Sequence, residues 1–205
     1  MQRIPVHPRT PHKRTVETVA DALGSGGVAL IPGDTSYLLA VRIGKKSAIE
    51  KLGRIKDRKK KFYSVMFRDF SELARYAEVT DRQFATVKRF LPGPYTFILK
   101  ASREVPKIML ENRKEIGIRI PDLPFIRELI AACGEPLIVS TAKGGNDEEE
   151  EFFTDPDSET PPWLHLVDII ADAGYQPAEL TSIIRLENDR YEVVRAGKGP
   201  VEEFS

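Results

Sequence analysis

The stretch Val28-Ala29-Leu30-Ile31-Pro32-Gly33-Asp34-Thr35-Ser36-Tyr37 sets the expectation for the fold. Its first four residues form a short apolar run, which is typical of a buried β-strand. Pro32-Gly33-Asp34-Thr35 has the composition of a turn. From Tyr37 to Ile43 the chain returns to apolar residues, which predicts a second strand. The stretch therefore predicts two strands joined by a turn that carries polar side chains.

The segments on either side predict a mixture of helices and strands. Before the stretch, apolar residues at helical spacing predict a helix that ends at a glycine-rich turn. After it, helices and strands follow one another without strict alternation, which favours a mixed-sheet α/β (α+β) domain. The helices are expected over 15–23, 47–54, 71–76, 80–90 and 125–133, and the further strands over 63–67, 95–99, 116–120, 137–140, 167–170, 181–186 and 191–194.

The chain length fits one domain with an arm in front of it. A chain of 205 residues buries enough surface to fold without a disulfide or a structural metal. Prolines at positions 5, 8 and 11 exclude a helix from residues 1–14, which we expect to form an extended N-terminal arm. The domain is expected over 15–200, with the polar, acidic segment 144–162 inserted as a loop. No run is apolar enough for a membrane span or a signal peptide, so the expected location is the cytoplasm.

Charge is distributed unevenly although the chain is neutral overall. Residues 54–61 read Arg-Ile-Lys-Asp-Arg-Lys-Lys-Lys, six cations against one acid. Such a run is stable either in water or against an anion. The structural alternative is a solvated helix end, where cations also favour the carbonyl pole of the helix. Zero net charge argues against a generally basic nucleic-acid binder, and residues 147–151 are acidic.

Several familiar motifs are absent from the sequence. Gly44-Lys45-Lys46 lacks both ends of a Walker phosphate loop, and the glycines at 24–27 do not complete the dinucleotide pattern. The three histidines show no metal-binding spacing, so no protein metal site is expected. No Gly-x-Ser-x-Gly elbow is present for Ser/His/Asp hydrolysis.

The remaining polar groups fall at the ends of predicted strands and in turns. Hydroxyl groups and turn amides donate hydrogen bonds to phosphate oxygens, while arginine and lysine neutralise their charge. This combination predicts an anion-binding cleft lined with basic residues. The groups concerned are Asp34-Thr35, Lys56 with Arg58, Arg119, Ser140 to Lys143, Thr181-Ser182 and Arg195.

With these motifs in place, the chain resembles the YrdC/YciO family, which includes the threonylcarbamoyl-adenylate synthases of tRNA modification. The order and spacing of the motifs carry the resemblance, from His7-Pro8 to Gly197. The N-terminal arm and the stretch Tyr95 to Lys100 are most similar to the YciO branch. The matching motifs are Pro32-Gly33-Asp34-Thr35-Ser36-Tyr37, Lys56-Asp57-Arg58, Pro92-Gly93-Pro94-Tyr95-Thr96, Gly117-Ile118-Arg119-Ile120-Pro121, Pro136 to Lys143, Thr181-Ser182 and Arg195-Ala196-Gly197.

The resemblance implies a single domain with a twisted mixed sheet and an adenylate-forming activity. Threonine, bicarbonate and ATP with Mg²⁺ would give threonylcarbamoyl-AMP and pyrophosphate for the t6A modification of tRNA. Because two anions must approach each other, Lys56 and Arg58 would clamp them as catalytic residues. Substrate and nucleotide binding would fall to Thr35, Tyr37, Arg119, Ser140, Thr141, Lys143, Thr181, Ser182 and Arg195.

The turn at Asp34-Thr35 and the cation Arg119 also have structural readings. The turn residues can hydrogen-bond locally, and a strand arginine can form a structural salt bridge.

The sequence also departs from the family pattern, which leaves alternatives open. Thr141-Ala142-Lys143 stands where the family has Ser-x-Asn, so that a cation replaces a neutral amide. Lys143 would act as a third phosphate clamp, or it marks a site that no longer makes the adenylate. The alternatives are a non-catalytic protein that binds double-stranded RNA or tRNA through the same cleft, and a small-nucleotide-binding regulatory module.

Overall fold

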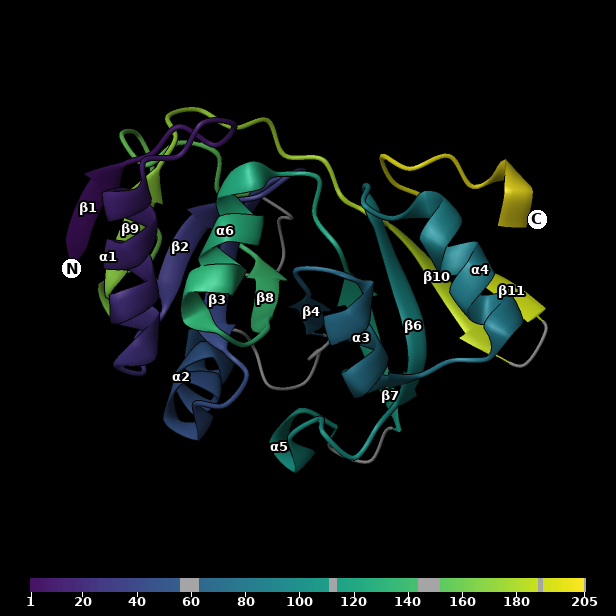
Figure 1. The fold of residues 1–205 in the computed structure, drawn as a ribbon. Coiled ribbons are helices and arrows are strands. Elements are labelled where there is room, and N and C mark those ends of the chain that lie inside the picture. Colours follow the sequence, from purple (N-terminus) through teal and green to yellow (C-terminus); the bar gives the residue numbers. More distant parts are fainter. Residues whose placement is uncertain (56–62, 111–113, 144–151, 188–189, 205) are drawn as a thin grey trace.

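The fold is known from a computed structural model, which describes residues 1–55, 63–110, 114–143, 152–187 and 190–204. Its centre is one mixed sheet with the strand order β1-β9-β2-β3-β8-β4-β7-β6-β10-β11, and β5 pairs with β6 at the side (Figure 1). The strands are β1 (Gln2–Pro5), β2 (Ala29–Pro32), β3 (Tyr37–Arg42), β4 (Ser64–Met66), β5 (Ala77–Glu78), β6 (Tyr95–Ala101), β7 (Glu115–Arg119), β8 (Leu137–Thr141), β9 (Ile169–Asp172), β10 (Ser182–Glu187) and β11 (Arg190–Arg195).

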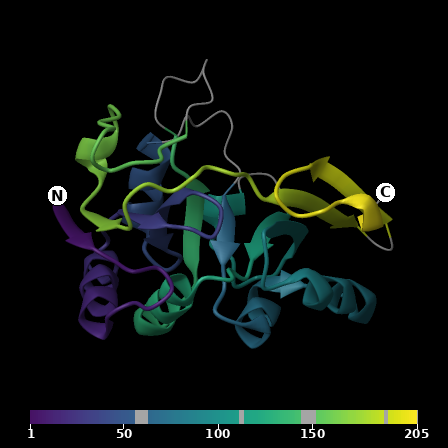
Figure 2. The same cartoon turned by 90° about the horizontal axis from the view of Figure 1, so that it is seen from above.

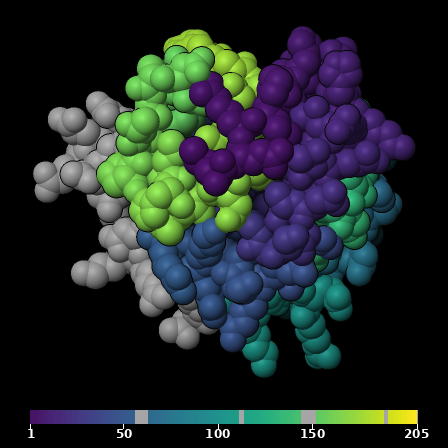
Figure 3. Space-filling model, turned by 90° about the vertical axis from the view of Figure 1, so that its left-hand side faces the viewer, coloured from purple at the N-terminus to yellow at the C-terminus, as the bar shows by residue number. Residues whose placement is uncertain are grey.

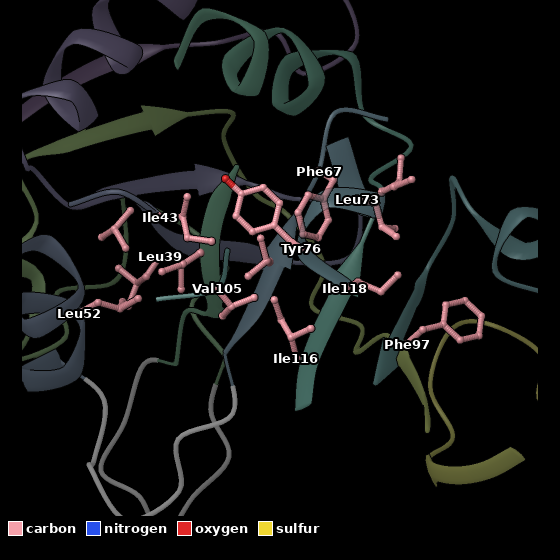
Figure 4. Packing of buried hydrophobic residues seen from close by; sticks show 14 of the residues in the cluster. Leu39, Ile43, Leu52, Phe67, Leu73, Tyr76, Phe97, Val105, Ile116 and Ile118 are labelled. Atoms are coloured by element: carbon pink, nitrogen blue, oxygen red, sulfur yellow. The ribbon is translucent and has the colours of Figure 1, made fainter. Parts of the chain in front are cut away.

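Helices cover the sheet and meet it through two apolar clusters. The helices are α1 (Lys13–Gly24), α2 (Lys46–Ile55), α3 (Phe70–Tyr76), α4 (Asp81–Phe90), α5 (Lys107–Leu110) and α6 (Pro124–Cys133). α1 and α6 lie side by side (Figure 1) and pack on one face of β2, β3 and β8. The other cluster joins α2, α3 and α4 to residues of the opposite face. Figure 4 shows it with Leu39, Ile43, Leu52, Phe67, Leu73, Tyr76, Phe97, Val105, Ile116 and Ile118.

Local sequence signals explain where several elements begin and end. The hydroxyl of Thr80 accepts the N–H of Gln83, whose side chain accepts the N–H of Thr80, so a capping box starts α4. Asp69 caps α3 through the N–H of Glu72. α6 ends at Gly134, whose φ of 70° is left-handed and favours glycine.

The predicted strand–turn–strand unit is the hairpin of β2 and β3. Pro32 pairs with Tyr37 in the antiparallel register, and the N–H of Gly33 donates to the carbonyl of Ser36 at 2.8 Å. Both strands are almost entirely buried. The hairpin therefore holds the Asp34-Thr35 turn at a defined place at the ends of these two strands.

The expected mixed sheet flanked by helices is confirmed, and the predicted helices and strands agree with the observed ones to within a few residues. The arm differs in one respect, because its residues Gln2–Pro5 form β1, which pairs in parallel with β9. Arg3 bonds to Asp157 at 2.6 Å and to Asp172, so the first residues lie against segment 152–172, as Figure 3 shows on that face. The basic character of the cleft remains a prediction, since Lys56 and Arg58 lie outside the described residues.

The two ends of the chain lie at opposite ends of the molecule (Figure 2). Within the described part of the chain, no helix has both the length and the apolar composition needed to cross a membrane.

Candidate functional site

Four neighbouring strands place two of the predicted arginines in one row across a face of the sheet. Arg195 of β11 pairs with Ile183 of β10, and Ile183 pairs with Thr96 of β6. Phe97 pairs with Ile118, so Thr96 lies beside Arg119 of β7. Residues opposite one another point to the same face. Three strand spacings separate the two arginine backbones by roughly 14 Å, with the hydroxyl of Thr96 between them.

The Asp34 carboxylate and the Arg119 guanidinium form a buried ion pair at one end of this row. Arg119 Nη2 lies 2.5 Å from Asp34 Oδ1, and their side chains are only 5% and 8% exposed. The pair joins the β2–β3 turn to β7, two elements that are 85 residues apart in the chain. Arg119 is thus fixed in orientation by the turn that the sequence predicted as part of the site.

Three buried polar atoms at this end have no hydrogen-bond partner among the described residues. They are Asp34 Oδ2, Arg119 Nε and the hydroxyl oxygen of Ser36. Buried polar groups are nearly always paired, with protein or with ordered water, because leaving one unpaired costs about 1–3 kcal/mol. These three atoms can bond ordered water or a ligand.

At the middle and far end of the row, Thr181 organises the predicted nucleotide residues. Its hydroxyl lies 2.9 Å from the hydroxyl of Thr96, and both side chains are buried. Its carbonyl accepts two bonds from the Arg195 guanidinium, from Nε at 3.0 Å and from Nη2 at 2.8 Å. The Thr181 carbonyl thus orients Arg195 as the Asp34 carboxylate orients Arg119.

Ser182 makes both of its hydroxyl bonds inside the protein. The hydroxyl donates to the carbonyl of Gly199 at 2.5 Å and accepts the N–H of Gly197 at 2.9 Å. These bonds hold the turn after Arg195 against the start of β10. Direct contact of Ser182 with a nucleotide stays a prediction, whereas its bonds to Gly197 and Gly199 are a property of the fold.

Gly197 has no room for a side chain. A Cβ there would collide with the carbonyl oxygen of Leu180 and lie 2.7 Å from the carbonyl carbon and oxygen of Thr181. Because these are backbone atoms, Gly197→Ala should lower the free energy of unfolding by about 1–3 kcal/mol and displace Arg195. Urea denaturation measures the loss, with Ala196→Ser as the neighbouring control. An unchanged urea transition would show that the turn accommodates the added Cβ without loss of stability.

Tyr37 lies in the core and binds a segment that passes beside it. Its side chain is fully buried, and its ring meets that of Phe153 edge to face at 5.5 Å. The hydroxyl donates to the carbonyl of Gly174 at 2.7 Å and accepts the N–H of Ala173 at 3.0 Å. Burial raises the pKa of Tyr37, against the opposing effect of the Ala173 N–H, so that the hydroxyl remains protonated and able to donate.

The predicted residues of β8 are divided between the two faces of the sheet. Ser140 pairs with Leu39 and Thr141 with Leu38, and successive strand residues point to opposite sides. Ser140 therefore shares its face with Tyr37, whereas Thr141 is on the face of the Arg119 row. Lys143 lies beyond the strand, with its ammonium 5.9 Å from the centre of the Phe152 ring and its carbonyl bound by the indole of Trp163 at 2.7 Å.

Thr35 is bonded through its backbone to the connection between β9 and β10. Its side chain is buried, and its carbonyl accepts the N–H of Glu179 at 2.7 Å. Glu179 and Thr181 belong to the same connection between β9 and β10, so this connection links the turn to the row. The predicted catalytic residues Lys56 and Arg58 lie outside the described residues, and their place relative to the row remains a prediction.

Sequence reasoning did not assign a role to Thr96 or to the partnership of Asp34 with Arg119. Thr96 is the last residue of the Pro92–Thr96 motif, and this motif could have identified it as a candidate site residue. A cavity of about 600 Å³ lies elsewhere, between α2 and α5. It contains none of the predicted site residues and is lined by Ile43, Gly44, Lys46, Ile49, Glu50, Pro106, Lys107 and Ile108.

Comparison with known proteins adds to this geometry. A sequence model of the Sua5/YciO/YrdC family, described as telomere recombination, matches residues 21–197. The YciO protein of Escherichia coli K12, itself uncharacterised, is 36% identical over 97% of both chains, and its crystal structure superimposes with a TM-score of 0.90, covering 100% of this chain and 99% of that one. A putative threonylcarbamoyl-AMP synthase of Methanocaldococcus jannaschii is 31% identical over 94% of this chain and 90% of its own.

One further solved structure shares the fold at low sequence identity. Sua5 of P. abyssi, crystallised with L-threonine, superimposes with a TM-score of 0.85 at 20% identity, covering 99% of this chain and 59% of its own. The predicted family resemblance is confirmed by the family match and by the full-length relatives. The chain belongs to the Sua5/YciO/YrdC family.

Proposed function

We propose that this protein binds ATP, L-threonine and bicarbonate and forms threonylcarbamoyl-AMP with release of pyrophosphate. The row that runs from Arg119 through Thr96 to Arg195 is the observation that carries the proposal. It presents two oriented guanidinium groups on one face of the sheet with buried hydroxyl groups between them. Such groups bind phosphate oxygens and stabilise charge that develops during phosphoryl chemistry.

The proposed reaction has two steps that balance without a redox partner. The amine of threonine and bicarbonate give a carbamate and water. A carbamate oxygen then attacks the α-phosphorus of ATP, the bond to the β-phosphate bridging oxygen breaks, and pyrophosphate leaves. Mg²⁺ enters with ATP as part of the substrate. The adenylate carries an activated carbonyl, which suits transfer to the adenosine of a tRNA.

The chain's own residues would supply position and charge. Lys56 and Arg58 would bring the carbamate and the α-phosphate together, since two anions approach each other in this step. Arg119 and Arg195 would hold the remaining phosphate oxygens, because each is pre-oriented by a bond on its other side. Preorganised donors need no rearrangement when charge develops.

Pyrophosphate release tests the proposal directly. We expect release that requires threonine, bicarbonate and ATP together and that stops when any one is omitted. Lys56→Ala should lower the rate by about 100-fold or more, the loss typical of a removed charge-stabilising group. Lys88→Ala, an exposed lysine on α4, is the matched control and should leave the rate unchanged.

Two results would contradict the proposal. Release that does not depend on threonine would indicate a simple nucleotide hydrolase. Absence of release, together with tight, steeply salt-dependent binding of double-stranded RNA, would favour the non-catalytic alternative, because affinity for phosphates falls with salt in proportion to the number neutralised.

A further inference from the structure

The α2–α5 cavity, the space of about 600 Å³ between these two helices, contains none of the residues of the row that runs from Arg119 to Arg195. α2 and α5 contact each other at the lower end of the molecule in Figure 1. α5 has only four residues, none of them buried, so it borders the space without filling it. The volume lies within the range of about 300–1,000 Å³ that is typical of small-molecule sites.

The inner wall of the cavity is apolar. Ile43, which follows β3, and Ile49 of α2 line it, and each is only 3% exposed because both belong to the large apolar cluster of Figure 4. Ile108 of α5 lines the cavity too, and its side chain is 37% exposed. An apolar group that enters the cavity would cover Ile108, and removal of apolar surface from water is favourable. The wall therefore suits a ligand with an apolar body.

Both helices contribute a lysine to the same cavity. Lys46 begins α2 and Lys107 begins α5, and both are exposed. Glu50 is the acid among the lining residues, and its carboxylate lies 3.9 Å from Lys46 Nζ, in a largely exposed pair that contributes little. Lys107 forms no ion pair within the described part of the chain. The N-terminus of α2 adds partial positive charge, and its first turn contains no acidic residue. The charges around the cavity therefore favour an anion.

We propose that the α2–α5 cavity binds a small amphipathic anion, a carboxylate that carries an apolar chain. The chain lies against Ile43, Ile49 and Ile108, and the carboxylate lies between the ammonium groups of Lys46 and Lys107. Lysine suits this arrangement, because its apolar stem covers apolar surface while its charged end stays in water. The inference goes beyond the proposed function and does not depend on it, since the two sites share no residue.

A small molecule fits this place better than a second protein does. A stable protein interface buries roughly 800 Å² on each partner and has an apolar centre. Of the large apolar side chains that are exposed in the described part of the chain, Ile108 is the one that lines the cavity. The apolar surface offered here is therefore concave and local, as in a ligand site.

Calorimetric titration with decanoate, and with decyltrimethylammonium as the cation that has the same chain, tests the sign of the charge. The wild-type protein should bind decanoate more tightly than the cation. Lys107→Glu should raise the Kd for decanoate by about 5-fold, because it turns an attraction into a repulsion at an exposed position. The double variant Lys46→Glu/Lys107→Glu should prefer the cation. Lys88→Glu makes the same charge change on the exposed side of α4 and should leave the wild-type preference intact.

The apolar part of the assignment has its own variant. Ile108→Ala should raise the Kd of both probes by about 5-fold, since it removes apolar surface that the chain would cover. Val194→Ala, at a side chain of β11 that is 44% exposed, is the matched control and should change neither Kd. Amide chemical shifts of Gly44 and Ile49 should move as decanoate binds, which locates the probe in the cavity. Thermal unfolding of each variant verifies that the fold is retained.

Several results would overturn the assignment. Decanoate that does not saturate the protein, or that binds without shifts at Gly44 and Ile49, is not held in the cavity. Equal affinity for both probes, or a decanoate preference that survives the double charge reversal, excludes a site for anions. A concentration-dependent dimer in analytical ultracentrifugation that Ile108→Ala weakens would make a second copy of the chain the occupant instead. Pyrophosphate release plays no part in these measurements, so failure of the proposed function and failure of this inference are distinguishable.

Discussion

Arg119→Met is expected to lower the free energy of unfolding by about 3–5 kcal/mol, because it leaves the Asp34 carboxylate buried without its charged partner. The two side chains are only 5% and 8% exposed and lie 2.5 Å apart. Taking either charge from water is costly, and the partner's attraction offsets much of that cost. Urea denaturation, followed by circular dichroism, measures the loss.

The double variant Asp34→Asn/Arg119→Met distinguishes an unpaired charge from a lost contact. It removes both charges, so it should be markedly more stable than Arg119→Met alone. Arg68→Met is the matched control, because Arg68 pairs with Asp69 at 3.0 Å while both side chains are about half exposed. Exposed pairs contribute about 0–1 kcal/mol. Equal effects at Arg68 and Arg119 would contradict the role of burial.

Phe153→Ala should lower the free energy of unfolding by a similar amount, about 3–5 kcal/mol, because it removes a buried apolar ring. The Phe153 ring is fully buried and lies between Tyr37, at 5.5 Å between ring centres, and Trp163, at 5.9 Å. Its removal leaves a cavity against Tyr37, which holds the start of the connection that ends at Thr181, so we also expect weaker ATP binding. Denaturation and calorimetry measure the two effects.

Phe152→Ala provides the matched control within the same segment. Phe152 is half-buried, and its ring meets the ammonium of Lys143 at 5.9 Å. Loss of this contact should lower the free energy of unfolding by about 1 kcal/mol. If the Phe152 variant is as unstable as the Phe153 variant, the buried ring of Phe153 is not what stabilises the fold at this segment.

Local patterns predicted most of the elements of the fold. The capping residues before α3 and α4, the proline and glycine that bound α6, and the turn between β2 and β3 are all short-range signals. The pairing of β1 with β9 was missed, because it joins residues that are far apart in the chain, such as Arg3 and Ile170, and no local periodicity encodes it. The arm's prolines correctly excluded a helix and did not reveal a partner.

In the candidate site, too, residue types were predictable from the sequence and long-range contacts were not. Residue types and motif spacing pointed to Thr35, Arg119, Thr181 and Arg195 as polar groups at strand ends. Motif spacing did not reveal which of Ser140 and Thr141 lies on the face of the sheet that carries Arg119. It also did not reveal Thr96, whose bond to Thr181 spans 85 residues. Side-chain facing depends on strand register, which tertiary packing sets.

The sequence by itself determined the family, the mixed α/β class and the chemical types of the candidate residues, because these follow from composition, periodicity and motif order. Only the tertiary structure decided that Asp34 holds Arg119, that Thr181 orients Arg195, and that the connection between β9 and β10 bonds to both Tyr37 and Thr35. Each of these contacts is a hydrogen bond or an ion pair between strands and turns that are far apart in the chain. Strand register and long-range packing bring such segments together, and neither can be deduced from neighbouring residues alone.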